Sequence, residues 1–162
     1  MNLYLNIDDF KQNNQIQIND NIRFLYAKQN TIMDGKFTKI LYSDDCVIMN
    51  GFYILFPIVC DKYNPHNSNN IRFIQYNKKS NIQLIEYLSQ LENKILTQYQ
   101  KYNNCDKYKD PCLQKQLYNK QFRVYKEEII ENKQISPLYI LKISGVWESF
   151  DKIGITYKFV EL

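Results

Sequence analysis

Histidine, glycine and arginine are scarce in this sequence. It has one histidine, His66, which lies in an asparagine-rich stretch, four glycines, and only three arginines among its 21 basic residues. A nucleophile activated by histidine therefore has little support. The sequence also lacks a glycine-rich phosphate loop and a metalloprotease motif. We therefore expect a protein that is not an enzyme and needs no cofactor.

Closely spaced cysteine pairs are also missing. Six residues separate Cys105 from Cys112, and thirteen separate Cys46 from Cys60. Structural zinc sites normally use pairs that are about two to four residues apart. The sequence therefore predicts no metal site and four free thiols, with Cys46 and Cys60 in the core of a hairpin.

No hydrophobic run is long enough to cross a membrane. The longest, residues 52–60, has about half of the roughly 20 residues that a membrane helix needs. Residues 1–9 lack the basic and apolar regions of a signal peptide. We expect a soluble intracellular protein with no membrane partner.

Alternation of apolar and polar residues predicts that much of the chain is strand. The pattern is clearest in residues 139–144 and 153–159, which we expect to form an antiparallel hairpin that closes the sheet. Asn50-Gly51, between two apolar runs, predicts a second hairpin with a tight turn. Further strands are expected at residues 22–26, 37–42, 46–49, 52–56 and 71–76.

One stretch has helical periodicity instead. Apolar residues at 85, 88, 91, 95 and 99 form one stripe, which predicts a helix over about residues 81–101. Residues 103–111 are expected to be a loop. Residues 113–133 fit either a helix or a strand, and we favour a strand over 121–125. The 162 residues thus predict one mainly β domain (1–162), an OB-like barrel with one inserted helix; a helix-capped sheet of another topology is the alternative.

Positive charge is concentrated in residues 94–126, which we call the cationic cluster. It holds eight basic and two acidic residues, whereas the whole chain has a net charge of +4. Lysine, asparagine and tyrosine are common throughout, as AT-rich codons would produce, so their clustering is the stronger signal. Tyrosines and one phenylalanine are interleaved with these lysines. Cations along phosphates and rings that stack on bases are typical of single-strand binding.

The candidate nucleic-acid-binding residues follow from this cluster and from the arginines and rings of two other strands. They are Arg23, Arg72, Phe73, Tyr76, Lys101, Tyr102, Lys107, Lys115, Tyr118, Lys120, Phe122, Arg123 and Tyr125.

Trp147 is the only tryptophan, and it has two interpretations. It is either a core plug at the end of a barrel, which we favour, or a platform on which bases stack.

The last part of the chain, Leu141 to Glu148 followed by Lys152 to Phe159, resembles the C-terminal hairpin of proteins from large DNA viruses of eukaryotes. Some of these are similar to the single-stranded-DNA-binding protein of phage T7, an OB barrel with an inserted helix. The resemblance implies a place in the host cytoplasm or the viral factory. Proteins of the phage type end in an acidic tail with a terminal aromatic residue, whereas this sequence ends Phe159-Val160-Glu161-Leu162.

These observations predict a non-enzymatic protein that binds single-stranded DNA without sequence preference, in viral replication or recombination. Binding to RNA and assembly into a homo-oligomer are left open. The alternative is a viral structural or protein-interaction module that uses the same β fold, on which the cationic surface would be incidental.

Overall fold

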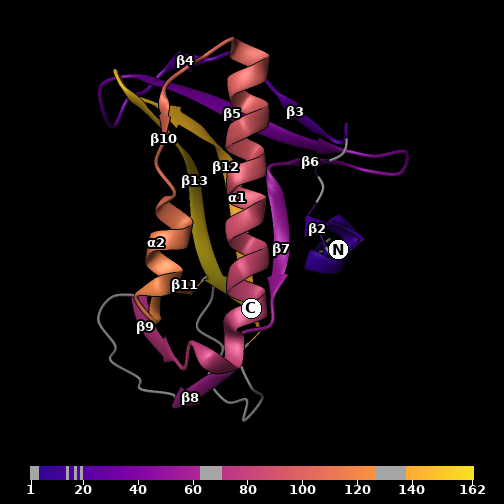
Figure 1. The fold of residues 1–162 in the computed structure, drawn as a ribbon, viewed down its shortest axis with the longest axis vertical. Helices are drawn as coiled ribbons and strands as arrows, with labels where there is room; N and C mark the ends of the chain where they lie inside the picture. Colours follow the sequence, from indigo (N-terminus) through magenta and orange to yellow (C-terminus); the bar gives the residue numbers. More distant parts are fainter. Residues whose placement is uncertain (1–3, 14, 17, 19, 63–70, 127–137) are drawn as a thin grey trace.

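A mixed β-sheet forms the body of the molecule, and one long helix runs along one of its faces (Figure 1). The computed structural model describes residues 4–13, 15–16, 18, 20–62, 71–126 and 138–162. Their helices are η1 (Ile7–Phe10), η2 (Lys79–Asn81), α1 (Ile82–Asn103) and α2 (Cys112–Tyr118). Their strands are β1 (Lys11–Gln12), β2 (Gln15–Ile16), β3 (Ile22–Phe24), β4 (Lys28–Gln29), β5 (Lys36–Ser43), β6 (Ile48–Asn50), β7 (Phe52–Phe56), β8 (Cys60–Lys62), β9 (Ile71–Tyr76), β10 (Tyr108–Lys109), β11 (Gln121–Lys126), β12 (Tyr139–Glu148) and β13 (Lys152–Glu161).

The predicted final hairpin is confirmed, and it is the centre of the sheet. β12 and β13 pair antiparallel along almost their whole length, with a bulge between Ile143 and Gly145. The other edge of β12 is shared by two strands: β5 pairs with its last part and β7 with its first. The other edge of β13 pairs in parallel with β10 near its start and with β11 near its end.

The sheet is open and mixed. Its main order is β3-β5-β12-β13-β11-β9-β8, so β3 and β8 lie at opposite edges and no pairing among the described strands joins them. The expected mainly β class with one long inserted helix is confirmed. The finer expectation of an OB-like barrel is corrected, because the parallel pairings at β13 give the helix-capped sheet that the sequence left as the alternative.

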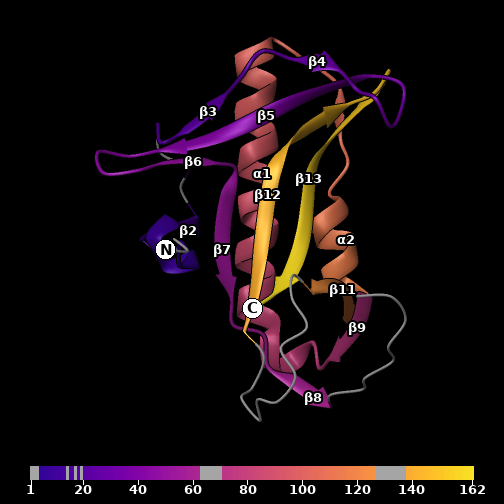
Figure 2. The ribbon, with the colours of Figure 1, turned by 180° about the vertical axis from the view of Figure 1, so that it is seen from behind.

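The core lies between α1 and the inner face of the sheet, which we define as the face toward the helices. The predicted helical stripe is confirmed: Ile85, Leu88, Leu91, Ile95 and Tyr99 are all fully buried. Burying each such side chain stabilises the fold by about 1.5–3 kcal/mol. β12 and β13 lie behind α1 in Figure 1 and in front of it in Figure 2, so one face of the sheet is turned away from the helix.

The hairpin predicted at Asn50-Gly51 is wrong. β6 pairs with β5, whereas β7 pairs with β12, so the chain changes partner at this point. Gly51 has a φ of +85°, and a Cβ there would lie 2.6 Å from the carbonyl oxygen of Ile143. Glycine is therefore required by a change of direction beside a neighbouring strand rather than by a two-residue turn.

The turn before β6 lies in residues 43–47 instead. The carboxylate of Asp44 accepts hydrogen bonds from the backbone N–H groups of Cys46 and Val47, both at 2.8 Å. The expectation that Cys46 is a core residue is corrected, because its side chain is exposed in this turn. None of the four cysteines forms a disulfide.

Helix α2 was not predicted, although the strand expected at 121–125 is confirmed as β11. The side chain of Glu92, which is fully buried on α1, holds the start of α2. Its two carboxylate oxygens accept from the backbone N–H groups of Leu113 at 2.9 Å and Gln114 at 2.8 Å. Burial raises the pKa of Glu92, and the two N–H donors oppose part of that rise.

Candidate nucleic-acid interface

The cationic cluster predicted from the sequence is dispersed: its lysines on α1, β10 and α2 lie on the helix side of the molecule, whereas Arg123 of β11 lies on the opposite face of the sheet. Lys107 forms an ion pair of 2.6 Å with Glu148 and donates to the carbonyl oxygen of Ser149 at 2.7 Å. Lys115 pairs with Asp110 at 2.6 Å. Both lysines therefore have intramolecular partners, and their role as phosphate ligands stays a prediction.

Two of the predicted stacking residues are part of the core. The side chains of Tyr76 and Phe122 are 4% and 0% exposed. The centroid of the Phe122 ring lies 4.8 Å from that of the Phe159 ring, and the Tyr76 hydroxyl donates to the carbonyl oxygen of Leu117. Buried rings have no face for a base to stack on, so the prediction for these two residues is corrected.

Other predicted residues are accessible but lie apart from one another. Tyr102 packs beside Phe24, with 5.6 Å between the ring centroids, and Tyr118 lies under the ammonium group of Lys78 at 3.6 Å. Lys101 is exposed at the end of α1, and Lys120 is exposed between α2 and β11. The side chain of Arg72 lies outside the described residues, although its backbone belongs to β9.

Three predicted residues do meet, on the face of the sheet opposite the helices. Strand register places Arg123 of β11 directly opposite Phe73 of β9, and both side chains are exposed. The Arg123 guanidinium lies 5.2 Å from the centroid of the Tyr125 ring. We call this side of the sheet the outer face. Arg23 of β3 is exposed and also lies on the outer face, where its register partner is Leu41 of β5.

Two more aromatic rings lie on the outer face, and sequence reasoning did not select either as a site residue. Trp147 of β12 is directly opposite Gly154 of β13 on one side and Phe37 of β5 on the other. A Cβ on Gly154 would lie 2.3 Å from ring atom Cζ2 of Trp147, and one on Gly145 would lie 2.6 Å from Cζ of Phe37. Each ring therefore rests on the backbone of a glycine in the neighbouring strand. We call this pair of rings the aromatic platform.

The position of Trp147 corrects the favoured core-plug interpretation. Its side chain is half-buried, and so is that of Phe37. One surface of each ring packs on the sheet while the rest stays accessible, as an aromatic side chain that covers a glycine commonly does.

A row of side chains crosses the outer face next to this platform. Lys142 of β12 is directly opposite Lys158 of β13 and Tyr53 of β7. The Lys142 ammonium lies 4.9 Å from the centroid of the Tyr53 ring. Like charges directly opposite one another in a sheet are destabilising.

Charge on the outer face has one sign. Alternation along each paired strand assigns side chains to this face, and among the described ones the charged residues are all basic: Arg23, Lys28, Lys39, Arg123, Lys142, Lys152 and Lys158. Ile140 and Val160 also lie on this face but are buried, so the accessible part of β12 on this face runs from Lys142 toward Trp147. In the sequence, these basic residues occupy the polar positions of strands in which apolar and polar residues alternate.

A polar network joins α1 to the end of β12 on the inner side. The Tyr99 hydroxyl donates to Glu148 at 2.7 Å and lies 3.2 Å from the hydroxyl of Thr38. Burial alone would raise the pKa of Glu148, but hydrogen bonds from Lys107 and Tyr99 lower it below its ordinary value. Burial raises the pKa of Tyr99. The network fixes the tip of the hairpin against the helix.

Comparisons with known proteins gave no match to a family model, to a curated protein or to a solved structure. The described residues contain no helix long and apolar enough to span a bilayer. In the same part of the chain, no three His, Cys, Asp or Glu side chains are grouped to hold a metal ion. The interpretation of the outer face therefore depends on its own geometry.

Proposed function

We propose that this protein binds single-stranded nucleic acid on the outer face of its sheet, as a binding module rather than a catalyst. The observation that carries the proposal is the aromatic platform of Phe37 and Trp147 beside a row of cations, on a face whose described charges are all positive. The function class expected from the sequence is kept, and its site moves from the cationic cluster to the sheet.

The chemistry of an unpaired strand fits this surface. Its phosphates are attracted to Lys39, Lys142 and Arg123, which lie on β5, β12 and β11. β5 adjoins β12, and only β13 separates β12 from β11. Strands about 4.8 Å apart bring these cations within reach of one short segment. Its bases expose flat faces that stack on aromatic rings for about 1–3 kcal/mol each. A duplex hides those faces, so we expect a preference for single strands.

The test compares lysines of the two regions in the same binding assay. Lys142→Gln and Lys39→Gln remove charges from the outer face, whereas Lys94→Gln and Lys101→Gln each remove an exposed charge of the cationic cluster from α1. A labelled single-stranded oligonucleotide is titrated by fluorescence anisotropy at several salt concentrations. Each outer-face variant should bind more weakly, and its salt slope should be lower by roughly 0.7, the effect of one lost phosphate contact on a single strand.

The helix-side variants separate the two locations. Lys101→Gln and Lys94→Gln should bind like the parent protein. Equal losses in all four variants would indicate a diffuse attraction to net charge, and losses confined to the two helix-side variants would return the site to the cationic cluster. Either outcome contradicts the proposal.

A further inference from the structure

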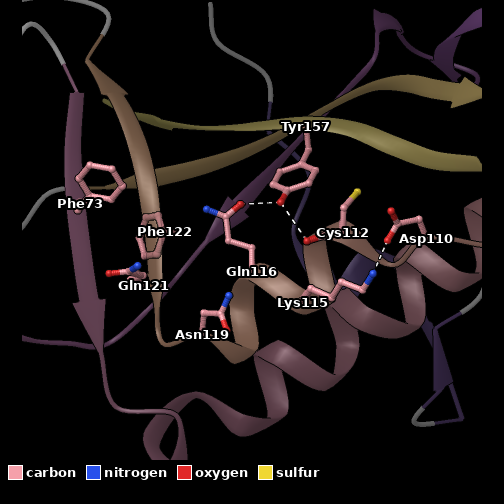
Figure 3. A pocket seen from close by; sticks show the side chains of 9 residues that line it. All are labelled: Phe73, Asp110, Cys112, Lys115, Gln116, Asn119, Gln121, Phe122 and Tyr157. Carbon is pink, nitrogen blue, oxygen red and sulfur yellow. Dashed lines mark hydrogen bonds and ion pairs between the residues drawn. The ribbon is translucent and has the colours of Figure 1, made fainter. Parts of the chain in front are cut away.

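A hollow opens between α2 and the first residues of β11, at the edge of the outer face. It has a volume of about 410 Å³, within the range of roughly 300–1,000 Å³ that small-molecule sites occupy. Figure 3 shows its lining side chains, which are Phe73, Asp110, Cys112, Lys115, Gln116, Asn119, Gln121, Phe122 and Tyr157. The hollow shares Phe73 with the outer face, where that residue is the register partner of Arg123.

Three amide side chains gather at one end of the hollow. Gln116 and Asn119 come from the end of α2, and Gln121 begins β11 (Figure 3). Gln116 is oriented by Tyr157, whose hydroxyl donates to Oε1 of Gln116 at 2.6 Å. That bond fixes the amide, and its nitrogen is directed away from Tyr157 as a donor (Figure 3). Asn119 and Gln121 are exposed and add both donors and acceptors.

Charge at the other end of the hollow is balanced. Lys115 and Asp110 form an ion pair with each other, so the hollow presents no single strong charge to a ligand. An exposed phenylalanine ring, a fixed amide donor and two further amides match a flat, uncharged ring with both hydrogen-bond donors and acceptors on its edge. A nucleobase has these properties.

We infer that the hollow takes one unpaired base of a strand bound to the outer face, and that it gives the protein a base preference at that position. This inference rests on the proposed function. The base stacks on Phe73, and the amides of Gln116, Asn119 and Gln121 bind its edge. Arg123, beside Phe73, holds the phosphate backbone where the strand leaves the sheet. The rest of the outer face binds without regard to sequence, since it offers stacking and charge only.

The first experiment uses the four mononucleosides, which carry no phosphate and so isolate the hollow from the lysines. Each is added to the full-length protein while the side-chain amide signals of asparagine and glutamine are followed by NMR. One nucleoside should shift the signals of Asn119 and Gln121 more than the others do. Asn119→Leu should remove the shift of the Gln121 amide, and Gln121→Met should remove that of the Asn119 amide. Gln75→Met, at the exposed register partner of Gln121 outside the hollow, should leave both shifts unchanged.

The second experiment uses homopolymeric oligonucleotides of the four bases. The parent protein should favour one of them by about tenfold, the scale of one well-made set of hydrogen bonds to a base edge. Asn119→Leu and Gln121→Met should remove the preference while binding itself persists. Oligonucleotide binding with no nucleoside response and no base preference would overturn this inference and leave the proposed function standing. Failure of every oligonucleotide to bind would overturn both.

Discussion

The buried carboxylate of Glu92 offers a test of how the helical layer is held. It accepts two backbone hydrogen bonds at the start of α2, at 2.9 and 2.8 Å. Glu92→Ala leaves both N–H groups without that acceptor, at about 1–3 kcal/mol each. The substitution also removes the free-energy penalty of burying a carboxylate, which offsets part of this loss of stability. We expect the variant to lose about 2–4 kcal/mol of the roughly 5–15 kcal/mol that stabilises a domain.

Glu92→Gln separates the hydrogen bonds from the charge, because its amide keeps one acceptor oxygen. It should lose about 1–3 kcal/mol, the effect of one unsatisfied N–H group. Burial raises the pKa of Glu92 in the folded protein. The stability linked to this group is therefore fully present below its unfolded pKa and is lost as the pH rises through the folded pKa.

The assay is urea unfolding followed by tryptophan fluorescence from acidic to neutral pH. The stability difference between the parent protein and Glu92→Gln should be largest in acid and should shrink toward neutral pH. Glu86→Gln, an exposed change on the same helix, is the control and should show no such trend. A difference that widens as the pH rises would mean that the two N–H donors outweigh burial, which contradicts this prediction.

Three further predictions concern the sheet and its network. Gly154→Ala should displace the Trp147 ring, since the added Cβ would lie 2.3 Å from it, and should lower stability by about 1–3 kcal/mol with a shifted tryptophan emission. Lys142→Gln should weaken oligonucleotide binding but keep the unfolding free energy within about 1 kcal/mol of that of the parent protein. Removing the charge opposite Lys158 offsets the lost contact with the Tyr53 ring. A large loss of stability would contradict this. Lys107→Met should lower stability in urea unfolding by about 1–3 kcal/mol, because its ion pair with Glu148 is lost, and should leave oligonucleotide affinity unchanged. A lower affinity at unchanged stability would indicate instead that Lys107 contacts the oligonucleotide.

The sequence predicts those elements whose signal is local and regular. The α1 stripe repeats over several turns, and the final hairpin alternates over two long strands, so both were found. Helix α2 has seven residues, too few for periodicity, and its capping carboxylate is about 20 residues away on α1. At Asn50-Gly51 the local turn signal was outweighed by pairing of β7 with β12, which lies far along the chain.

The candidate site was harder to predict because nearness in the sequence is not nearness in space. Residues 94–126 run through the end of α1, a short strand, α2 and β11, and their lysines point to different neighbours. The outer face instead draws Phe37, Lys142 and Trp147 from β5 and β12, which only strand register brings together. One local clue did exist: two glycines flank the final turn, and the lone tryptophan lies between them.

Binding on the aromatic platform is tested by the fluorescence of Trp147, the only tryptophan, during titration with a single-stranded oligonucleotide. We expect saturable quenching as bases stack on the aromatic platform. The quenching should weaken steeply with added salt and be much smaller with a duplex of the same length. Saturable binding detected by anisotropy with no change in tryptophan emission would contradict binding on the aromatic platform. The absence of any binding at low salt would contradict it as well.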